Sequence, residues 1–166
     1  ERTAAELARQ YGVDETEARI AALLHDCTKK LDIEEQLKLC DAYNIDMDEM
    51  ERTTLKLQHS RTGAEIARHV FGVSDAVYDA IRYHTTGRPD MTMLEKIIYI
   101  ADYMEPTRDF PEVEALRALA YEDLDKAMCM GTQLTMEEMK EKKRVLHPNT
   151  VACYEELREI CDRNDR

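Results

Sequence analysis

The 166-residue sequence predicts an all-α protein built as a helical bundle, and three observations support this fold class. Apolar residues recur at spacings of three and four along most of the chain, which is the period of an amphipathic helix. Several of these stretches begin with an Asp, Ser or Thr cap and end at Gly, Asn or Pro. Only the β-branched run 97–100 resembles a strand, and the capping box of Thr92 and Glu95 before it favours a helix there too.

The order of the helices follows from these start and stop signals. Gly12 and Gly72 end two of them, because glycine readily adopts the left-handed backbone of a helix C-cap. Asp14 and Asp32 each stand three residues before a Glu and start the second and third segments, and Pro106 ends the segment that contains 97–100. The expected segments cover residues 4–11, 14–25, 32–39, 46–51 (a polar turn or short helix), 58–71, 74–84, 92–102, 113–120, 123–143 and 148–161.

Charge limits the partners of the protein. The chain has 23 Lys and Arg residues against 35 Asp and Glu residues, a net charge of −12, and no Lys/Arg-rich block. Such a chain repels a nucleic-acid backbone and an anionic membrane surface, so neither polymeric nucleic acid nor a membrane is an expected partner. The longest apolar runs also stop well short of the about 20 residues that span a bilayer.

Chain length and cysteine content predict a single domain in a reducing compartment. A chain of this length buries one sizeable core without a metal or disulfide staple, so we expect one domain over residues 1–166. The five cysteines are odd in number, form no CxxC pair and are preceded by no signal-peptide pattern. Reduced thiols in a cytoplasmic protein are the simplest interpretation.

Five polar residues fall on or beside helix faces that are otherwise apolar: His25, Asp26, His59, His84 and Asp102. Burying such groups costs several kcal/mol unless they are paired or bind a metal ion. A lone histidine on an apolar face is more often a hydrogen-bonded core residue, and a lone aspartate is more often ion-paired. Three imidazoles and two carboxylates together are ligands for a divalent ion such as iron, manganese or zinc. The combination therefore predicts a metal site.

The remaining histidines and the methionines carry no such pattern. His69 and His147 stand in polar surroundings, and both are interpreted as surface residues. The methionines of 128–139 are interpreted as core packing, because flexible Met side chains fill irregular gaps.

Four sequence blocks carry a resemblance to a known family. They read Ala-Leu-Leu-His25-Asp26-Cys-Thr-Lys29, His59-Ser-Arg-Thr-Gly-Ala, Ile-Arg-Tyr-His84-Thr-Thr-Gly-Arg-Pro and Tyr-Ile-Ala-Asp102-Tyr-Met-Glu-Pro-Thr-Arg108. In this order they resemble the HD-domain phosphohydrolases, and within that superfamily the YqeK-type symmetrical bis(5′-nucleosyl)-tetraphosphatases. The similarity extends over nearly the whole chain, and the last two blocks are its most specific part.

The resemblance implies a helical HD domain with a defined activity and site. The activity is the hydrolysis of dinucleoside tetraphosphates, such as diadenosine tetraphosphate, at the middle of the phosphate chain to give two nucleoside diphosphates. The implied cofactor is a divalent metal ion, iron first, with manganese or another divalent ion left open. The implied metal ligands are His25, Asp26 and Asp102; the implied catalytic residues are Asp26, His59 and His84; and the residues expected around the phosphates are Lys29, His59, His84, Thr85, Arg88 and Arg108.

The expected mechanism uses water activated by the metal ion to attack a central phosphorus, with a nucleoside diphosphate as leaving group. His59 and His84 either bind phosphate oxygens, protonate the leaving group or hold a second ion, and we favour a single ion. Because the whole protein is acidic, the cations Lys29, Arg88 and Arg108 are expected to lie near the metal.

Some alternatives remain open at this stage. The family has a further ligand histidine upstream of the Thr-Ala-x-Glu-Leu-Ala segment, so this chain is expected to be a shortened copy that holds its metal weakly. A nucleotidase or phosphodiesterase for another nucleotide, a non-catalytic nucleotide-binding module and a bundle with hydrogen-bonded core histidines are the competing interpretations. Expected partners are a dinucleoside polyphosphate or another nucleotide and, as an open alternative, a second copy of the chain in a homodimer.

Overall fold

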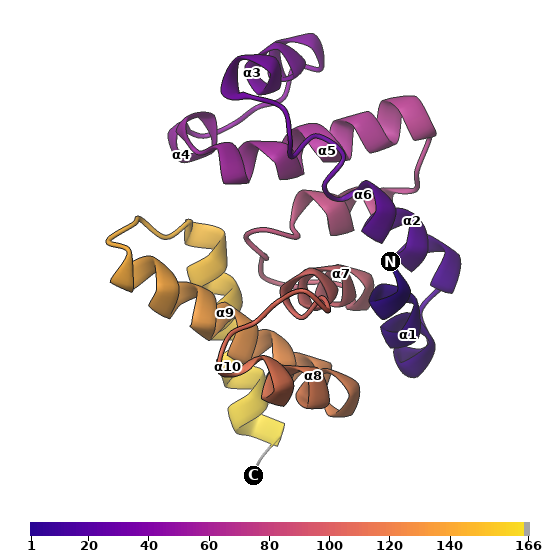
Figure 1. Cartoon of the computed structure of the whole chain (residues 1–166), viewed down its shortest axis with the longest axis vertical. Helices are drawn as coiled ribbons and strands as arrows, with labels where there is room; N and C mark the ends of the chain where they lie inside the picture. Colours follow the sequence, from indigo (N-terminus) through magenta and orange to yellow (C-terminus); the bar gives the residue numbers. More distant parts are fainter. Residues whose placement is uncertain (165–166) are drawn as a thin grey trace.

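The structure is a computed structural model that describes residues 1–164, and these residues form ten helices and no strand (Figure 1). The predicted all-α fold is therefore confirmed, including a helix over 97–100. The helices are α1 (Arg2–Tyr11), α2 (Glu15–Leu24), α3 (Ile33–Ala42), α4 (Glu49–Thr53), α5 (Leu55–Phe71), α6 (Asp75–Arg82), α7 (Met93–Tyr103), α8 (Val113–Glu122), α9 (Leu124–Glu141) and α10 (Pro148–Asn164).

Most of the local signals act as the sequence predicts, whereas α4 (Glu49–Thr53) lies about three residues later than predicted and α5 starts earlier. Capping boxes start α3 and α7, and left-handed Gly12 and Gly72 end α1 and α5. Helix α5 begins at Leu55, three residues before its predicted start. The backbone carbonyl of Thr54 accepts hydrogen bonds from the N–H groups of Leu57 and Gln58, whereas the Thr54 side chain makes no cap. No side chain therefore marks this start in the sequence.

Helix α7 lies at the centre of the molecule (Figure 1) and contacts α1, α2, α6 and α9. Its residues Ile97, Ile98 and Ile100 are fully or almost fully buried. The same apolar cluster continues from α1 to α10, while Cys40, Ile45 and Met47 form a small separate cluster beside α3. None of the described helices combines the length and the apolar character needed to cross a bilayer. This layout places the C-terminal end of α7 beside the ends of α2 and α6.

The turn between α6 and α7 carries His84, and its Gly87 has a positive φ of 66°. A Cβ atom at Gly87 would lie 2.9 Å from the Cys153 Sγ atom of α10. Gly12 has nearly the same φ, 67°, but a Cβ atom there would meet nothing within 4 Å. The two glycines therefore share the backbone requirement and differ only in the space around them.

We expect Gly87→Ala to lower the free energy of unfolding by about 2–4 kcal/mol, as the sum of left-handed backbone strain and overpacking against Cys153. Gly12→Ala is the matched control. It is expected to lower the free energy of unfolding only by the backbone strain, about 1–2 kcal/mol. Urea unfolding of both variants measures the difference. Equal losses at the two positions would contradict the close packing of the turn on α10.

Candidate metal centre and substrate cleft

His25 and His84 lie in the turns that follow α2 and α6, not on the helix faces where the sequence analysis puts them. The last carbonyl groups of a helix have no partner within it, and each imidazole donates from Nδ1 to one of them. His25 Nδ1 lies 2.7 Å from the carbonyl oxygen of Ala22, and His84 Nδ1 lies 2.6 Å from that of Ile81. With Nδ1 protonated, the neutral ring presents its Nε2 lone pair to a ligand, which is the usual arrangement at metal sites.

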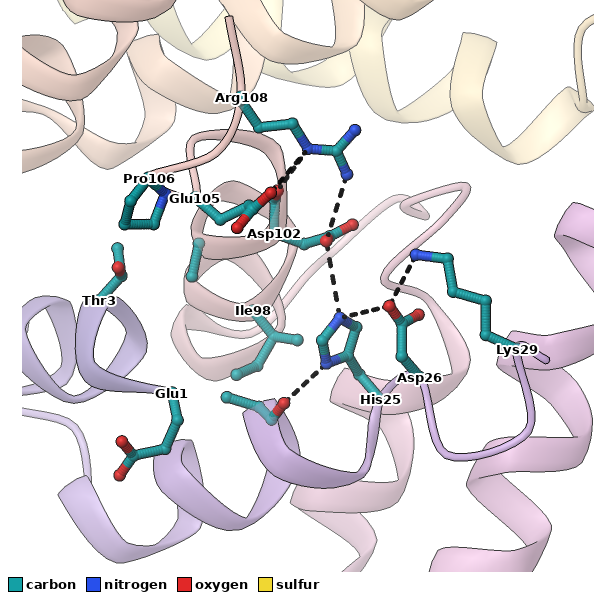
Figure 2. A pocket seen from close by; sticks show the side chains of 12 residues that line it. Glu1, Thr3, His25, Asp26, Lys29, Ile98, Asp102, Glu105, Pro106 and Arg108 are labelled. Carbon is teal, nitrogen blue, oxygen red and sulfur yellow. Dashed lines mark hydrogen bonds and ion pairs between the residues drawn. The ribbon is translucent and has the colours of Figure 1, made fainter.

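The predicted metal ligands and the other two histidines converge on one place. His25 Nε2 lies 3.4 Å from Asp26 Oδ2 and 3.6 Å from Asp102 Oδ1 (Figure 2). Asp26 Oδ1 lies 3.1 Å from His59 Nε2 and 3.6 Å from His84 Nε2. The two rings of His59 and His84 also meet, with their Nε2 atoms 3.1 Å apart. Asp26 thus contacts all three imidazoles, and His25 links it to Asp102, in a cluster formed by α5, α7 and the turns after α2 and α6.

The donor set of this cluster fits a divalent metal ion. His25 Nε2 and Asp26 Oδ1 are buried and have no hydrogen-bond partner within the described residues. Unpaired buried polar atoms are costly, so atoms of this kind indicate a missing ligand. The candidate ligand atoms of His25, His84 and Asp102 lie within 4.8 Å of one another, as do those of Asp26, His59 and His84. Imidazole nitrogen and carboxylate oxygen are common ligands for divalent metals.

The electrostatics of the cluster favour a positive charge at its centre. Burial opposes the charge on Asp102, but the nearby His25 ring and other positive charges outweigh burial and lower the pKa of Asp102 to about 2. Burial is likewise outweighed at Asp26, where the nearby rings of His59 and His84 and the hydrogen bond from Lys29 hold the pKa well below its usual range. Burial lowers the pKa of His84, which keeps its ring neutral, whereas the two carboxylates overcome burial and raise the pKa of His25. A metal cation satisfies the same preference for positive charge.

A buried polar network holds His59 in place. Thr28 donates through its hydroxyl to the His59 carbonyl oxygen at 3.0 Å and lies 2.8 Å from the Thr62 hydroxyl. Gln36 of α3 donates to the Thr28 carbonyl oxygen at 2.6 Å and accepts from the Thr62 hydroxyl at 2.5 Å. Gln36 and Thr62 are completely buried. The network therefore ties α3 and the turn after α2 to the part of α5 that carries His59.

The turn that carries His84 is held from two sides. The Thr85 hydroxyl donates to the Ser60 hydroxyl of α5 at 3.2 Å, and the Thr150 hydroxyl of α10 donates to the Thr86 carbonyl oxygen at 2.9 Å. Helix α10 thus supports the site from outside the central helices.

A cleft of about 740 Å³ opens from the cluster toward α9. This volume is within the roughly 300–1,000 Å³ of small-molecule sites. Most of the residues predicted around the phosphates lie along it, and these are Lys29, His59, His84, Thr85 and Arg108. A second cavity of about 330 Å³ is lined by His25, Asp26 and Asp102 among others (Figure 2), and it shares Lys29, Asp102 and Arg108 with the cleft.

The cleft also contains residues that the sequence analysis misses. Lys56 of α5 lies three residues before His59, and this spacing, which puts two side chains on one face of a helix, is the signal that could have found it. Tyr103 lies next to Asp102 in the sequence, and its ring meets that of Phe110 edge-on, with centroids 5.6 Å apart. No sequence pattern marks this aromatic pair.

Arg88 is a correction, because the structure does not bring it into the cleft. Its Nε donates to Glu95 at 2.7 Å and its Nη2 to Asp79 at 3.2 Å, while its guanidinium lies over the Tyr83 ring. The Glu95 side chain is completely buried. Compensating this buried carboxylate is the physical reason why Arg88 turns away from the proposed phosphates.

We therefore expect Arg88→Met to lower the free energy of unfolding by about 2–4 kcal/mol, because it leaves the buried Glu95 carboxylate unpaired. The exposed Arg158 of α10 provides the control, and Arg158→Met is expected to stay within about 0.5 kcal/mol of the parent. Urea unfolding measures both. If Arg88→Met leaves the free energy of unfolding unchanged and raises KM for nucleotide substrates, Arg88 is a substrate-binding residue as first predicted.

His147 is a second correction, since this predicted surface residue is only 9% exposed. With Asp48 and Glu51 it forms a third group of potential ligands between α4 and α10. Its Nδ1 accepts a hydrogen bond of 3.1 Å from the Asn149 N–H, so the ring proton is on Nε2, which lies 3.3 Å from an Asp48 oxygen. Glu51 is already bound by Arg61. His147 thus connects two helices and does not offer a free lone pair to a metal.

Comparisons with known proteins agree with this geometry. The family model described as HD domain matches residues 1–107. The symmetrical bis(5′-nucleosyl)-tetraphosphatase of Bacillus subtilis is 40% identical over 153 residues, which cover 92% of this chain and 82% of that protein. The protein of the same name from Halalkalibacterium halodurans is 39% identical over 156 residues, which cover 93% of this chain and 83% of that protein. A crystal structure from Clostridium acetobutylicum, described as a predicted HD superfamily hydrolase involved in NAD metabolism, superposes with a TM-score of 0.91 at 42% identity, covering 95% of this chain and 84% of that one.

Proposed function

Because this chain belongs to the HD-domain family, we propose that it is a metal-dependent hydrolase that cuts dinucleoside tetraphosphates symmetrically into two nucleoside diphosphates. The observation that carries the proposal is the convergence of three imidazoles and two carboxylates beside the cations Lys29 and Arg108. The names of the two tetraphosphatases support the choice of diadenosine tetraphosphate as the substrate to test first.

His25, Asp26 and Asp102 are the residues that we propose as metal ligands, with His59 and His84 beside them. When bound, the ion acts as a Lewis acid and activates water for attack on the phosphoanhydride. Asp26 contacts both His25 and His59, so it holds the two rings in one orientation. The ligand types suit borderline and hard ions, and we propose iron as the resident ion and manganese as the next candidate. Metal analysis of the purified protein, followed by reconstitution with each ion, tests this choice.

Proton positions in the cluster point to His59 as the general acid. The His59 and His84 Nε2 atoms are 3.1 Å apart, which is hydrogen-bond distance when one of the two carries a proton. The proton of neutral His84 is on Nδ1, where the ring donates to the Ile81 carbonyl oxygen. His59 Nε2 therefore carries the shared proton, and it is the atom that can pass a proton to the leaving phosphate oxygen.

The charges along the cleft suggest how the substrate lies. Lys29 and Arg108 pair with Asp26 and Asp102 of the cluster, whereas Glu138 and Glu141 of α9 also line the cleft. A tetraphosphate is attracted to the first group and repelled by the second, so we place the phosphates along the cations. One nucleoside then extends toward α9. Cleavage at the middle of the chain follows if the central phosphates lie nearest to Asp102.

The identity of the reaction products tests this proposal. Metal-loaded protein is incubated with diadenosine tetraphosphate, and the nucleotides are separated, with metal-free protein as the control. ADP as the sole product is the expected result, and AMP with ATP would contradict symmetrical cleavage. Turnover of other nucleotides alone would favour a nucleotidase or phosphodiesterase, and binding without any product would favour a non-catalytic module. The homodimer stays a prediction, which light scattering can measure.

A further inference from the structure

Arg117, on α8 and outside the cluster, binds three backbone carbonyl groups of the segment between α7 and α8. Its Nε donates to the Met104 carbonyl oxygen at 3.1 Å, and its Nη2 donates to those of Glu105 at 2.9 Å and Arg108 at 3.2 Å. The remaining Nη1 pairs with Glu114 of the same helix. The guanidinium thus binds three backbone carbonyls and one carboxylate, and Arg117 is not among the residues that line the cleft.

This arrangement fixes the shape of the segment. Met104 is the C-cap of α7, where carbonyl groups have no partner within the helix. A planar guanidinium presents several donors in a rigid fork, so three carbonyls bound to it have a defined mutual geometry. An ammonium group is a single point of charge and cannot hold all three in this way. The backbone from Met104 to Arg108 is therefore shaped by one side chain.

The segment ends in Arg108, whose side chain contacts Asp102 of the metal cluster. Arg108 Nε lies 3.3 Å from the Asp102 carbonyl oxygen, and its Nη2 lies 3.4 Å from Asp102 Oδ1 (Figure 2). The Arg108 side chain is 45% exposed, so packing restrains it little. Apart from an ion pair with Glu105 and its contacts with Asp102, the position of the Arg108 side chain depends on the backbone that carries it, and Arg117 binds that backbone.

We propose that Arg117 is a positioning residue for the substrate: by binding the Met104–Arg108 backbone it places the Arg108 guanidinium where a substrate phosphate meets Asp102. The inference rests on the proposed function, since it takes the tetraphosphate as the ligand of Arg108. Arg117 itself lies outside the cluster and does not line the cleft, and it reaches the lining only through the Arg108 backbone carbonyl. Its loss should therefore weaken substrate binding through Arg108 and leave the metal ligands intact.

The test is a double-mutant cycle on diadenosine tetraphosphate hydrolysis. We expect Arg117→Met to raise KM about fivefold with kcat within about twofold, because binding is lost and the reacting groups remain. Arg117→Lys should recover only part of the loss. In an Arg108→Ala background, Arg117→Met should raise KM by less than about twofold, because the side chain that it positions is already absent. Equal effects of Arg117→Met in both backgrounds would overturn the proposal.

A second readout does not depend on activity. Trypsin cleavage after Arg108, followed by mass spectrometry, should become several-fold faster in Arg117→Met, because the segment is released from α8. Arg68→Met is the matched control, since Arg68 also joins two helices by binding Asp75 and covering Tyr78, but far from the segment. An unchanged cleavage rate in Arg117→Met also overturns the proposal. If the parent protein cleaves no tetraphosphate, the proposed function fails by itself, and faster trypsin cleavage still reports the backbone role.

Discussion

Asp102→Asn is expected to abolish diadenosine tetraphosphate hydrolysis and to lower the metal content of the purified protein at the same time. The substitution removes the charge of a carboxylate whose oxygen lies 3.6 Å from His25 Nε2. A bound metal contributes several kcal/mol to the stabilisation of a phosphoryl transition state, so losing it should slow turnover by on the order of 10³-fold or more. Initial rates and metal analysis on the same samples measure both effects.

Asp109→Asn is the matched control for this experiment. Asp109 lines the same cleft and is exposed, but it is not among the grouped candidate ligands. The control should keep its metal and retain activity within about threefold, because an exposed charge in this position acts mainly through the screened field of the cleft. Full activity of metal-replete Asp102→Asn would contradict the proposed role of Asp102.

Gln36→Leu is expected to lower the free energy of unfolding by about 2–4 kcal/mol, because it leaves the Thr28 carbonyl without its Gln36 donor and removes a partner of the Thr62 hydroxyl in a fully buried place. The comparison is Gln133→Leu on α9, where the amide bonds only to Glu137 at the exposed surface. Gln133→Leu should change the free energy of unfolding by no more than about 0.5 kcal/mol. Urea unfolding of the two variants gives the difference, and similar losses would mean that the buried network contributes little.

The fold was predictable because its signals are local. Capping boxes such as Asp32 with Glu35 and stops such as Gly12 depend on residues a few positions apart, and the structure follows them. The start of helix α5 at Leu55 was not predicted, because the Thr54 carbonyl oxygen accepts its first hydrogen bonds and no side chain caps it.

The site was predictable only as a set of ligand-type residues. The sequence shows which histidines and aspartates could be ligands, but it does not show how they are oriented. The ring of His84, for example, is oriented by a hydrogen bond to a carbonyl at the end of α6. Arg88 was misjudged because Glu95 reads as a simple capping residue, and its complete burial arises only when the helices pack. Arg117 acts on a segment of a different element, so residue spacing alone could not define its role.

The ligand-type side chains of the cluster come from four different helices or helix ends, and this origin affects folding as well as chemistry. An ion held there links chain segments that are far apart in sequence, so its binding stabilises the native arrangement of all of them at once. Since an ion bound only by the native state stabilises that state in proportion to the logarithm of its concentration, scarcity of the ion makes the protein easier to unfold and to degrade. The abundance of this protein in a cell would then follow the supply of the ion.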